Sequence, residues 1–418
     1  MRRVVVTGIG TINSTGHNVK DSFKAVVDGV CGIDTITLFD ASEFSVKIAG
    51  EVKDFDPTTV MDKKEVKKAD RFIQLGIKAA LEAMIDSGYV TQEDKKVDAS
   101  IADRFGMISG SGIGGLSTIE RNSIVCETKG SRKVSPFFIP SSLANMLSGF
   151  ISIEHNLRGP SLSHVTACAA STHALNDAVK TIMIGGADRI LVVGAESAIC
   201  AAGVAGFAAM KALSTRNDEP KKSSRPFDID RDGFVMGEGA GALVVEDLEI
   251  ALARGAKIYA EIIGFGESGD ANHITSPVMD GPLRAMKAAF EMVKSITGEY
   301  PKIDYINAHG TSTPVGDKNE TAAIKALFDG KDIPLVSSTK GQIGHCLGAA
   351  GAIEAIFTIK ALNEGIIPPT INIENQDPEC DLDYVANVAR KANLTTVMSN
   401  NFGFGGTNGS VIFRRYEK

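Results

Sequence analysis

The sequence predicts an α/β protein with largely parallel central strands, and three observations lead to this fold class. Short apolar segments alternate with longer amphipathic ones along the whole chain, the order that parallel strands and crossover helices require. One segment, Arg189 to Gly194, is apolar enough for a strand buried on both faces. Glycine is enriched, with 43 in 418 residues, which suits many tight strand–helix connections.

The first half of the chain contains four expected strands and four expected helices. The first strand ends at a Gly8-Ile9-Gly10 turn, and Gly88 and Gly185 follow apolar helical stripes as C-terminal stops. The expected strands span residues 3–7, 105–109, 189–194 and 242–246, and the expected helices span residues 18–28, 72–87, 169–184 and 248–254.

The second half restarts after Gly255 with the same alternation, so we expect two halves, residues 1–255 and 256–418. Each half contains a strand-like segment that leads through a turn into an apolar helix, which hints at an internal duplication without a clean period. The expected strands span residues 258–264, 303–308, 335–338, 395–399 and 410–414, and the expected helices span residues 281–296, 321–328 and 347–363.

The bulk composition is that of an ordinary globular enzyme and excludes several other classes. A net charge of −7 argues against a general nucleic-acid role, which would need a basic excess. Six scattered cysteines without a CxxC pair argue against a disulfide framework and a zinc site, and they suit a reducing compartment. The N-terminus does not resemble a signal peptide, and no apolar run approaches the ~18 residues of a membrane span.

One stretch, His164 to His173, is a candidate for the reactive centre because Cys168 lies at the entrance of a predicted buried helix. The unpaired N–H groups and positive end of a helix favour an anion. A cysteine in that place ionises more easily and becomes a nucleophile. Taken alone, the stretch equally fits a small buried structural cysteine, which is the commoner case.

A glycine-rich segment, Gly110 to Gly115, follows an expected strand and satisfies the dinucleotide fingerprint G-x-G-x-x-G. That fingerprint needs a second strand that ends in an acidic residue about 20 positions later. The following residues, 118–129, are polar and mixed and contain no such strand. We therefore interpret the glycines as a tight or ligand-lining turn and not as a nucleotide site.

Two of the seven histidines have settings that suit catalysis. His309 follows the expected strand 303–308, at the strand end where open α/β sheets place ligands. His345 lies in a glycine-flanked turn before an apolar helix. Together with Cys168 they fit a cysteine protease or another acyl-transfer enzyme. A metal site is not expected, because the histidines lie far apart in sequence with no carboxylate in i,i+4 register.

Beyond these residues, a set of motifs resembles the β-ketoacyl-acyl-carrier-protein synthases of the condensing-enzyme family, most closely their synthase II type. The motifs follow the family's order and span nearly the whole chain. They are Val165-Thr166-Ala167-Cys168-Ala169, Arg225-Pro226-Phe227-Asp228 with Asp232-Gly233-Phe234, Ala308-His309-Gly310-Thr311-Ser312-Thr313, Ser338-Thr339-Lys340-Gly341 through Gly344-His345, and Asn401-Phe402-Gly403-Phe404-Gly405-Gly406-Thr407-Asn408.

The resemblance implies a thiolase-like fold, in which two similar α/β halves stack as five layers (αβαβα), and a homodimer. It also implies an acyltransferase of fatty-acid biosynthesis. Cys168 takes an acyl chain from acyl carrier protein as a thioester. Malonyl-carrier protein then loses carbon dioxide, and its enolate attacks the acyl-Cys168 thioester to give a 3-oxoacyl chain two carbons longer.

The resemblance further implies roles for individual residues. His309 and His345 donate N–H groups to the enolate oxygen and do not act as general bases, while Lys340 supports His345 and the site's electrostatics. The backbone N–H groups of Cys168 and Phe404 hold the acyl oxyanion. The remaining assignments are gating by Phe404 with Phe402, a supporting carboxylate at Glu354, malonyl and pantetheine contacts by Thr311 and Thr313, and an acyl pocket lined by Ile113 and Phe207.

Some of these assignments keep a plainer alternative. Glu354 also fits a helix-surface glutamate, the two threonines a simple turn, and Ile113 and Phe207 ordinary core packing. Basic residues that would dock the acidic carrier protein also fit a solvated charged face; they are Lys64, Lys67, Lys68, Arg132, Lys133 and Lys211. No cofactor is expected apart from a structural monovalent cation. The expected location is the cytoplasm of a bacterial-type enzyme, with a mature organellar form left open.

Four rival functions remain at this stage. A thiolase shares the fold but needs a second cysteine near the C-terminus, where this chain has Phe402-Gly403-Phe404-Gly405-Gly406. Non-catalytic partners that shape polyketide chain length typically lack the cysteine, whereas Cys168 is present here. A synthase I and a polyketide ketosynthase share the motifs, so the sequence does not separate them from a synthase II.

Overall fold

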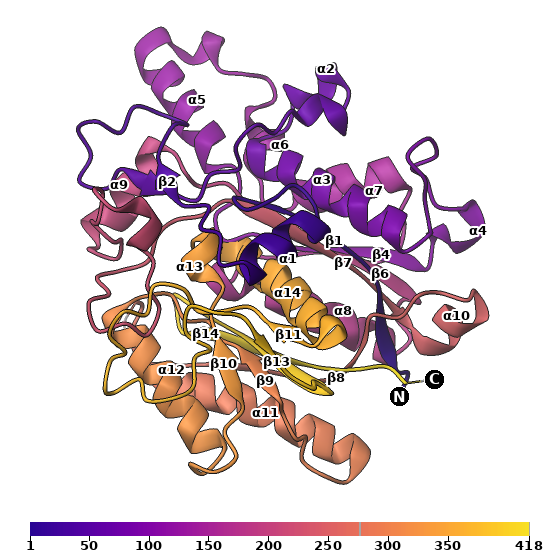
Figure 1. The fold of residues 1–418 in the computed structure, drawn as a ribbon. Helices are drawn as coiled ribbons and strands as arrows, with labels where there is room; N and C mark the ends of the chain where they lie inside the picture. The colour runs from indigo at the N-terminus through magenta and orange to yellow at the C-terminus, as the bar shows by residue number, and fades with distance from the viewer. Residues whose placement is uncertain (276, 418) are drawn as a thin grey trace.

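The computed structural model describes residues 1–275 and 277–417, and its centre is one ten-stranded sheet (Figure 1). The strand order is β10-β9-β13-β14-β8-β1-β7-β6-β4-β5. The first five strands in the chain that enter it are β1 (Val4–Asn13), β4 (Phe105–Gly110), β5 (Ser161–His164), β6 (Arg189–Glu196) and β7 (Gly239–Asp247). The last five are β8 (Ala260–Gly269), β9 (Tyr305–Asn307), β10 (Leu335–Ser337), β13 (Thr396–Gly403) and β14 (Thr407–Arg414).

The sheet is an internal duplication, as the sequence hinted. The first half has the order β1-β7-β6-β4-β5 and the second β8-β14-β13-β9-β10. In each half the first two neighbouring pairs are antiparallel and the last two are parallel. The halves join where Val4, Val5 and Val6 of β1 pair with Ile262, Glu261 and Ala260 of β8.

Helices divide the molecule into the five layers that the resemblance implies. Helix α3 (Arg71–Asp86) packs on the outer face of β1, β7 and β6, and α11 (Asp280–Thr297) packs on β8 and β14. Helices α8 (Ala170–Met183) and α14 (Ala350–Glu364) pack against each other and against strands of both halves (Figure 1). The five-layered α/β prediction is therefore confirmed.

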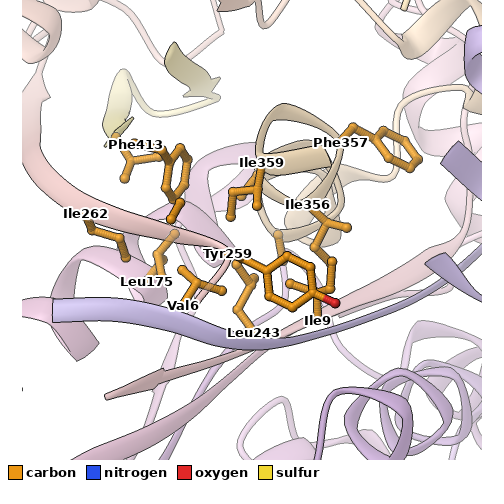
Figure 2. Packing of buried hydrophobic residues seen from close by; sticks show 14 of the residues in the cluster. Val6, Ile9, Leu175, Leu243, Tyr259, Ile262, Ile356, Phe357, Ile359 and Phe413 are labelled. Atoms are coloured by element: carbon orange, nitrogen blue, oxygen red, sulfur yellow. The ribbon is translucent and has the colours of Figure 1, made fainter. Parts of the chain in front are cut away.

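The largest cluster of buried apolar side chains surrounds α14, which is buried along almost its whole length. Figure 2 shows Ile356 and Ile359 of this helix facing Val6 and Ile9 of β1, with Phe413 of β14 nearby. Because this layer contacts both halves, burial of apolar surface there favours a single folded unit. We keep residue 255 as the predicted boundary between the halves; α10 (Leu248–Ala253) precedes it and β8 follows it.

The remaining elements surround this framework. Their bounds are α1 (Val19–Val27), α2 (Lys63–Val66), α4 (Ala99–Ala102), α5 (Leu116–Lys129), α6 (Phe138–Ser142), α7 (Met146–His155), α9 (Ala201–Ala209), α12 (Pro314–Leu327) and α13 (Lys340–Ile343), with short strands β2 (Asp34–Thr35), β3 (Ile48–Ala49), β11 (Ile366–Ile367) and β12 (Arg390–Lys391). Helices α5, α7 and α9 were not predicted, whereas β5 is the strand-like segment expected before Cys168. Among the described residues, no helix is both long and apolar enough to cross a membrane.

Strand β1 corrects the prediction that the first strand ends at a Gly8 turn. The strand continues to Asn13 and is buried throughout. A Cβ on Gly8 would lie 2.3 Å from the Ala83 carbonyl oxygen, and one on Gly10 would lie 2.1 Å from that of Ala79. The glycines are present because α3 packs directly on the strand, so they mark a close approach and not a turn.

Helix α12 corrects the expected start at residue 321, because it begins seven residues earlier at Pro314. Thr313 has the extended backbone of an N-cap residue, and proline is favoured in the first helical turn. This earlier start matters for the site, because it places Asp317 and Glu320 on a helix beside the turn that follows β9.

Candidate active site

Cys168 lies in a short 3-10 turn, η3 (Ala167–Ala169), between β5 and α8. Ala167 has a φ of 50°, a left-handed backbone that a non-glycine residue rarely adopts. The cysteine therefore precedes the α-helix instead of starting it. The residue is only 8% exposed.

Burial opposes the expected easy ionisation of Cys168. Burial raises the pKa of the thiol to about 12. The positive charge of Lys340 and the backbone N–H groups of Phe404 and Cys168 oppose this rise. Desolvation of the sulfur is the largest of these effects, so it exceeds the opposing effects of Lys340 and the two N–H groups.

The fold brings His309 and His345 to this sulfur from the second half. His309 follows β9, and His345 follows α13. The Cys168 Sγ and one ring nitrogen of each histidine lie within 4.8 Å of one another, and His345 Nε2 lies 3.0 Å from Sγ. The two imidazole rings meet edge to face with their centroids 5.3 Å apart. Residues far apart in sequence thus form one constellation.

Both histidines are neutral at neutral pH. Burial lowers the pKa of each ring well below 6.5, and the nearby Lys340 charge lowers it further. A neutral imidazole offers one N–H donor and one acceptor nitrogen. Within the part of the chain that the structure describes, Nδ1 of each ring has no hydrogen-bond partner. The tautomer of His345 therefore depends on the Cys168 thiol at its Nε2.

Lys340 and Glu354 form a fully buried ion pair behind the histidines. Asn401 Nδ2 donates to the second carboxylate oxygen of Glu354 at 2.7 Å. The alternative of a helix-surface glutamate is therefore wrong, because Glu354 is fully buried. The pair keeps a positive charge close to the thiol and both imidazoles, which a lone buried lysine would lose by deprotonation.

A cavity of about 570 Å³ leads to the three reactive side chains. Ile113 and Phe207, expected in an acyl pocket, line it, as do Thr311 and Thr313, whose hydroxyls lie 3.0 Å apart. The G-x-G-x-x-G segment contributes Gly112 to the wall, in agreement with its interpretation as a ligand-lining turn.

The segment after β13 closes one side of this cavity. The Phe404 ring lies 6.5 Å from that of Phe207, and the Phe402 ring packs edge to face on His309 at 5.7 Å. The Phe404 backbone N–H points at Cys168 Sγ. Phe402 thus contacts a histidine, whereas Phe404 combines a cavity-facing ring with a backbone donor.

The six basic residues expected to dock a partner occupy separate places. Lys64 and Lys67 are exposed on and after α2, and Arg132 and Lys133 are exposed on the 3-10 turn η2 (Ser131–Lys133). Lys68 pairs with Glu65 at 2.6 Å and lies over the Phe137 ring, so it is only partly available. Lys211 alone among the six lines the cavity.

Three residues of the site received no role from the sequence: Glu320, Asp270, and Phe234, which stands in one of the matched motifs. Glu320 accepts the backbone N–H groups of His309 and Gly310, both at 2.8 Å, and burial raises its pKa to about 7. Phe234 packs edge to face on His345 at 5.3 Å. Asp270 accepts from Asn408 Nδ2 at 2.7 Å beside the Phe404 segment. Thr313-Pro314 was an available helix-start signal that would have placed Glu320 on a helix next to His309.

The wide sequence spacing of the histidines does not exclude a metal site, because folding brings one thiol and two imidazoles together. The absence of a metal remains a prediction. The constellation itself is a buried thiol with neutral imidazoles at the end of an open cavity, which is suited to covalent acyl transfer.

Comparisons with known proteins agree with this chemistry. The sequence models of the β-ketoacyl synthase N-terminal and C-terminal domains match residues 1–251 and 259–374. A 3-oxoacyl-[acyl-carrier-protein] synthase 2 of Vibrio harveyi is 50% identical over 418 residues, covering 99% of both chains. The synthase 2 of Coxiella burnetii is 49% identical over 417 residues, again covering 99% of both.

Solved structures give the same result. A β-ketoacyl synthase from Burkholderia phymatum superposes with a TM-score of 0.91 at 35% identity and full coverage of both chains. A type II polyketide ketosynthase in complex with its acyl-carrier protein superposes with a TM-score of 0.86 at 29% identity, also over both full chains. The chain belongs to the β-ketoacyl synthase family of the thiolase-like condensing enzymes. It is an acyltransferase that forms 3-oxoacyl products, with the function of the type 2 synthases.

Proposed function

We propose that the enzyme condenses malonyl-acyl carrier protein with an acyl chain held on Cys168, elongating fatty acids by two carbons. One observation carries this proposal: Cys168 Sγ lies within 4.8 Å of the ring nitrogens of His309 and His345, next to the cavity described above. One nucleophile and two N–H donors are the groups that acyl transfer followed by decarboxylation requires.

In the first half-reaction, the Cys168 thiol attacks the acyl thioester of the carrier protein. Because the thiol pKa is about 12, the proton must leave as the sulfur attacks. His345 Nε2, 3.0 Å from the sulfur, accepts it and passes it to the departing pantetheine sulfur. The new S–C bond replaces the old one, and the proton count is unchanged. This base step departs from the role implied by the resemblance, in which His345 is an N–H donor and not a general base.

In the second half-reaction, the malonyl group loses carbon dioxide, and the electron pair of the broken C–C bond moves to the thioester oxygen. N–H donors from His309 and His345 stabilise this enolate oxygen, each by roughly 3 kcal/mol when preorganised. The enolate carbon then attacks acyl-Cys168. The Cys168 and Phe404 N–H groups hold the resulting oxyanion, and its collapse releases the Cys168 thiolate, which takes up one proton.

The surrounding residues support these steps in distinct ways. Burial is the main reason that the histidines stay neutral, and the charge of Lys340, which Glu354 holds in place, lowers their pKa values further. Thr311 and Thr313 offer hydroxyl groups to malonyl and pantetheine. Phe404, flanked by Gly403, Gly405 and Gly406, gates the acyl chain, with Phe402 holding His309 in place.

We further propose acyl carrier protein as the partner. The exposed cations Lys64, Lys67, Arg132 and Lys133 would attract an acidic surface, and Lys211 would meet the pantetheine at the cavity. Because such contacts are screened, the apparent KM for the carrier protein should rise with salt. Reversing the charge of Lys64 and Lys67 should raise KM while leaving kcat almost unchanged.

A homodimer is supported by the free edge of the sheet. Strand β5 is the last strand at its end of the sheet, and Leu162 and Val165 beside it are exposed. Exposed apolar residues on an unpaired edge favour pairing with a second chain. Sedimentation of the wild type and of Leu162→Asp, which should shift toward monomer, tests this. We place the enzyme in the cytoplasm, where its six free cysteines would stay reduced.

No organic cofactor is needed for these steps, and a structural monovalent cation is the one ion we propose. Asn307 of β9 and Ser399 of β13 are register partners, and both are fully buried. Their side-chain oxygens have no hydrogen-bond partner among the described residues. Such oxygens are the ligands a hard cation takes, so these residues fit one. Its contribution would be to stability, because the reaction steps above use only protein groups.

The decisive experiment is a condensation assay with malonyl-carrier protein and acyl-carrier proteins of increasing chain length, with Cys168→Ala as the control. We expect a 3-oxoacyl product from the wild type alone. If the wild type makes no such product at any chain length, the proposed function is wrong. A thiolase would instead require coenzyme A thioesters, and a polyketide ketosynthase would accept a 3-oxoacyl primer and extend it repeatedly.

A further inference from the structure

A buried carboxylate outside the catalytic constellation joins the two halves of the molecule behind the cavity wall. Glu196 is the last residue of β6 and is fully buried. Its Oε2 accepts the backbone N–H groups of Gly112 at 2.5 Å and Gly348 at 3.0 Å. Its Oε1 faces the Ser111 hydroxyl at 3.1 Å and the Ile113 N–H at 3.2 Å.

These partners belong to two different segments. The segment Ser111–Gly114, here called the wall loop, contributes Gly112 and Ile113 to the cavity. Gly348 lies in the turn η5 (Leu347–Ala349), and Leu347 lines the same cavity. One carboxylate therefore holds a wall segment of the first half against a wall segment of the second half.

The contact between the two segments leaves no room for adjustment. A Cβ on Gly348 would lie 2.1 Å from the Gly112 nitrogen, and one on Gly112 would lie 2.7 Å from Glu196 Oε2. Every partner of the carboxylate is an N–H or O–H donor, so its acceptor oxygens satisfy all of them at once. The position of the Ile113 side chain in the cavity then depends on this one residue.

We propose that Glu196 is a positioning residue that sets the acyl-chain-length preference by fixing the wall loop, and with it Ile113, against the Leu347–Gly348 turn. The proposal rests on the proposed function, in which the acyl chain of Cys168 occupies this cavity. Glu196 makes no contact with the reacting atoms. Its effect reaches the substrate through the depth and shape of the cavity wall.

Glu196→Gln tests the proposal, because glutamine keeps the volume but replaces one acceptor oxygen with an NH₂ donor. Wherever that NH₂ lies, it faces backbone N–H groups of the wall loop, and the loop must move. The measurement is kcat/KM for saturated short-, medium- and long-chain acyl-carrier proteins. We expect the preference to flatten, with the ratio between the best and worst chain falling about tenfold, the effect of one or two methylene groups in a hydrophobic pocket.

Two readouts separate positioning from general damage. Malonyl decarboxylation, measured without an acyl substrate, should stay unchanged in Glu196→Gln, because the malonyl group meets Thr311, Thr313 and the two histidines of the cavity and not the wall loop. The matched control is Glu82→Gln. The Glu82 carboxylate accepts the Thr11 and Val19 N–H groups at 3.0 and 2.9 Å, and it does not line this cavity. That variant should keep the chain-length profile of the wild type.

The outcomes are distinct. An unchanged profile in folded Glu196→Gln, or an equal loss for every chain and for decarboxylation, overturns the proposal. Failure of the wild type to elongate any chain overturns the proposed function instead. Should Glu196→Gln not fold, Ser111→Ala carries the test, because it removes only the hydroxyl that bonds Glu196 and the Gly114 N–H. It should flatten the profile by a smaller factor, and an unchanged profile there also overturns the proposal.

Discussion

The turns Ala167–Ala169 and Leu347–Ala349 occupy the same place in the duplicated fold. Each is a 3-10 turn that opens with a non-glycine residue at positive φ, 50° for Ala167 and 46° for Leu347, and each leads into a central helix, α8 or α14. The residue that follows differs. In the first turn it is Cys168, beside the cavity, and in the second it is Gly348, pressed against Gly112.

The difference shows how duplication separates scaffold from chemistry. Both turns have the same type of backbone conformation, but only the first has space for a reactive side chain. The second offers its N–H to Glu196 and supplies His345 three residues before Gly348. One half thus provides the nucleophile, and the other provides the groups that act on it. Substitutions at four positions test this division, from the largest expected effect to the smallest.

Removing the side chain that distinguishes the first turn should have the largest effect. Cys168→Ala should lower the condensation rate on the order of 10⁴-fold or more, because no other group can carry the acyl chain. Cys168→Gln should lose condensation but keep or increase malonyl decarboxylation, since His309 and His345 remain. Product analysis of both half-reactions checks this, and loss of both activities in a folded Cys168→Gln protein would contradict the division of roles.

Lys340 acts from the second half on the residues of both turns. Lys340→Met should destabilise the protein by about 3–5 kcal/mol, because Glu354 would be left buried without its partner. It should also raise the histidine pKa values, since the lysine charge lowers them. As the pH falls, the histidines become protonated and activity is lost. In Lys340→Met this loss should occur at a higher pH than in the wild type.

The measurements are denaturant unfolding and the pH profile of malonyl decarboxylation. Lys360→Met is the matched control, because Lys360 forms a surface ion pair with Glu364, and both residues stand on α14. Its loss should cost under about 1 kcal/mol and leave the profile in place. An acid limb that stays fixed in Lys340→Met would show that the lysine charge does not reach the histidines.

Gly348→Ala tests the closed second turn. The new methyl group would lie 2.1 Å from the Gly112 nitrogen, so the wall loop must shift. We expect a loss of about 1–3 kcal/mol, as in other overpacked interiors, measured by thermal unfolding. Gly206→Ala in α9 is the control, because its Cβ would meet nothing within 4 Å; helix propensity should make it neutral or stabilising. A Gly348→Ala protein as stable as the wild type would refute the steric argument.

The smallest effect concerns the strained backbone that the two turns share. Ala167→Gly removes the strain of a left-handed backbone in the folded protein, but it also increases the conformational entropy of the unfolded chain. The two effects on the free energy of unfolding are opposite in sign, and each is about 1 kcal/mol. The net change in the free energy of unfolding should stay within about 0.5 kcal/mol. Ala169→Gly, at a φ of −91°, has no strain to relieve and should destabilise by about 0.5–1 kcal/mol. Equal losses in the two variants would mean that Ala167 stores no strain.

Most of the site residues were predicted from short sequence motifs. Most of the residues that were missed owe their position to long-range packing. Cys168, His309 and His345 stand in short, recognisable segments, so the sequence identified them without showing that they meet. Glu196 and Glu320 stand in no such segment. Each is held by backbone N–H groups of another segment. The helix start at Thr313-Pro314 was a signal for Glu320, whereas nothing in the chain distinguishes Glu196 from a surface glutamate until the fold is known.

The same limit explains the errors of detail. Gly8 and Gly10 suggest a turn because glycine is common in turns. They are glycines because α3 packs directly against the strand, which only the tertiary structure shows. The helix after Cys168 was correctly placed, yet its effect on the thiol was overestimated, because helix-end stabilisation can be read locally and desolvation cannot. The fold class fared better, since alternating apolar segments depend on periodicity alone.

The central position of β1 has a consequence for synthesis of the chain. This strand ends at Asn13, but its neighbour β7 begins at Gly239 and its other neighbour β8 at Ala260. At roughly 5–20 residues per second, on the order of ten to forty-five seconds separate the emergence of β1 from that of β7. The first strand to leave the ribosome therefore waits, apolar and unpaired, for most of the first half to be made, and this interval is when the nascent chain most needs a chaperone.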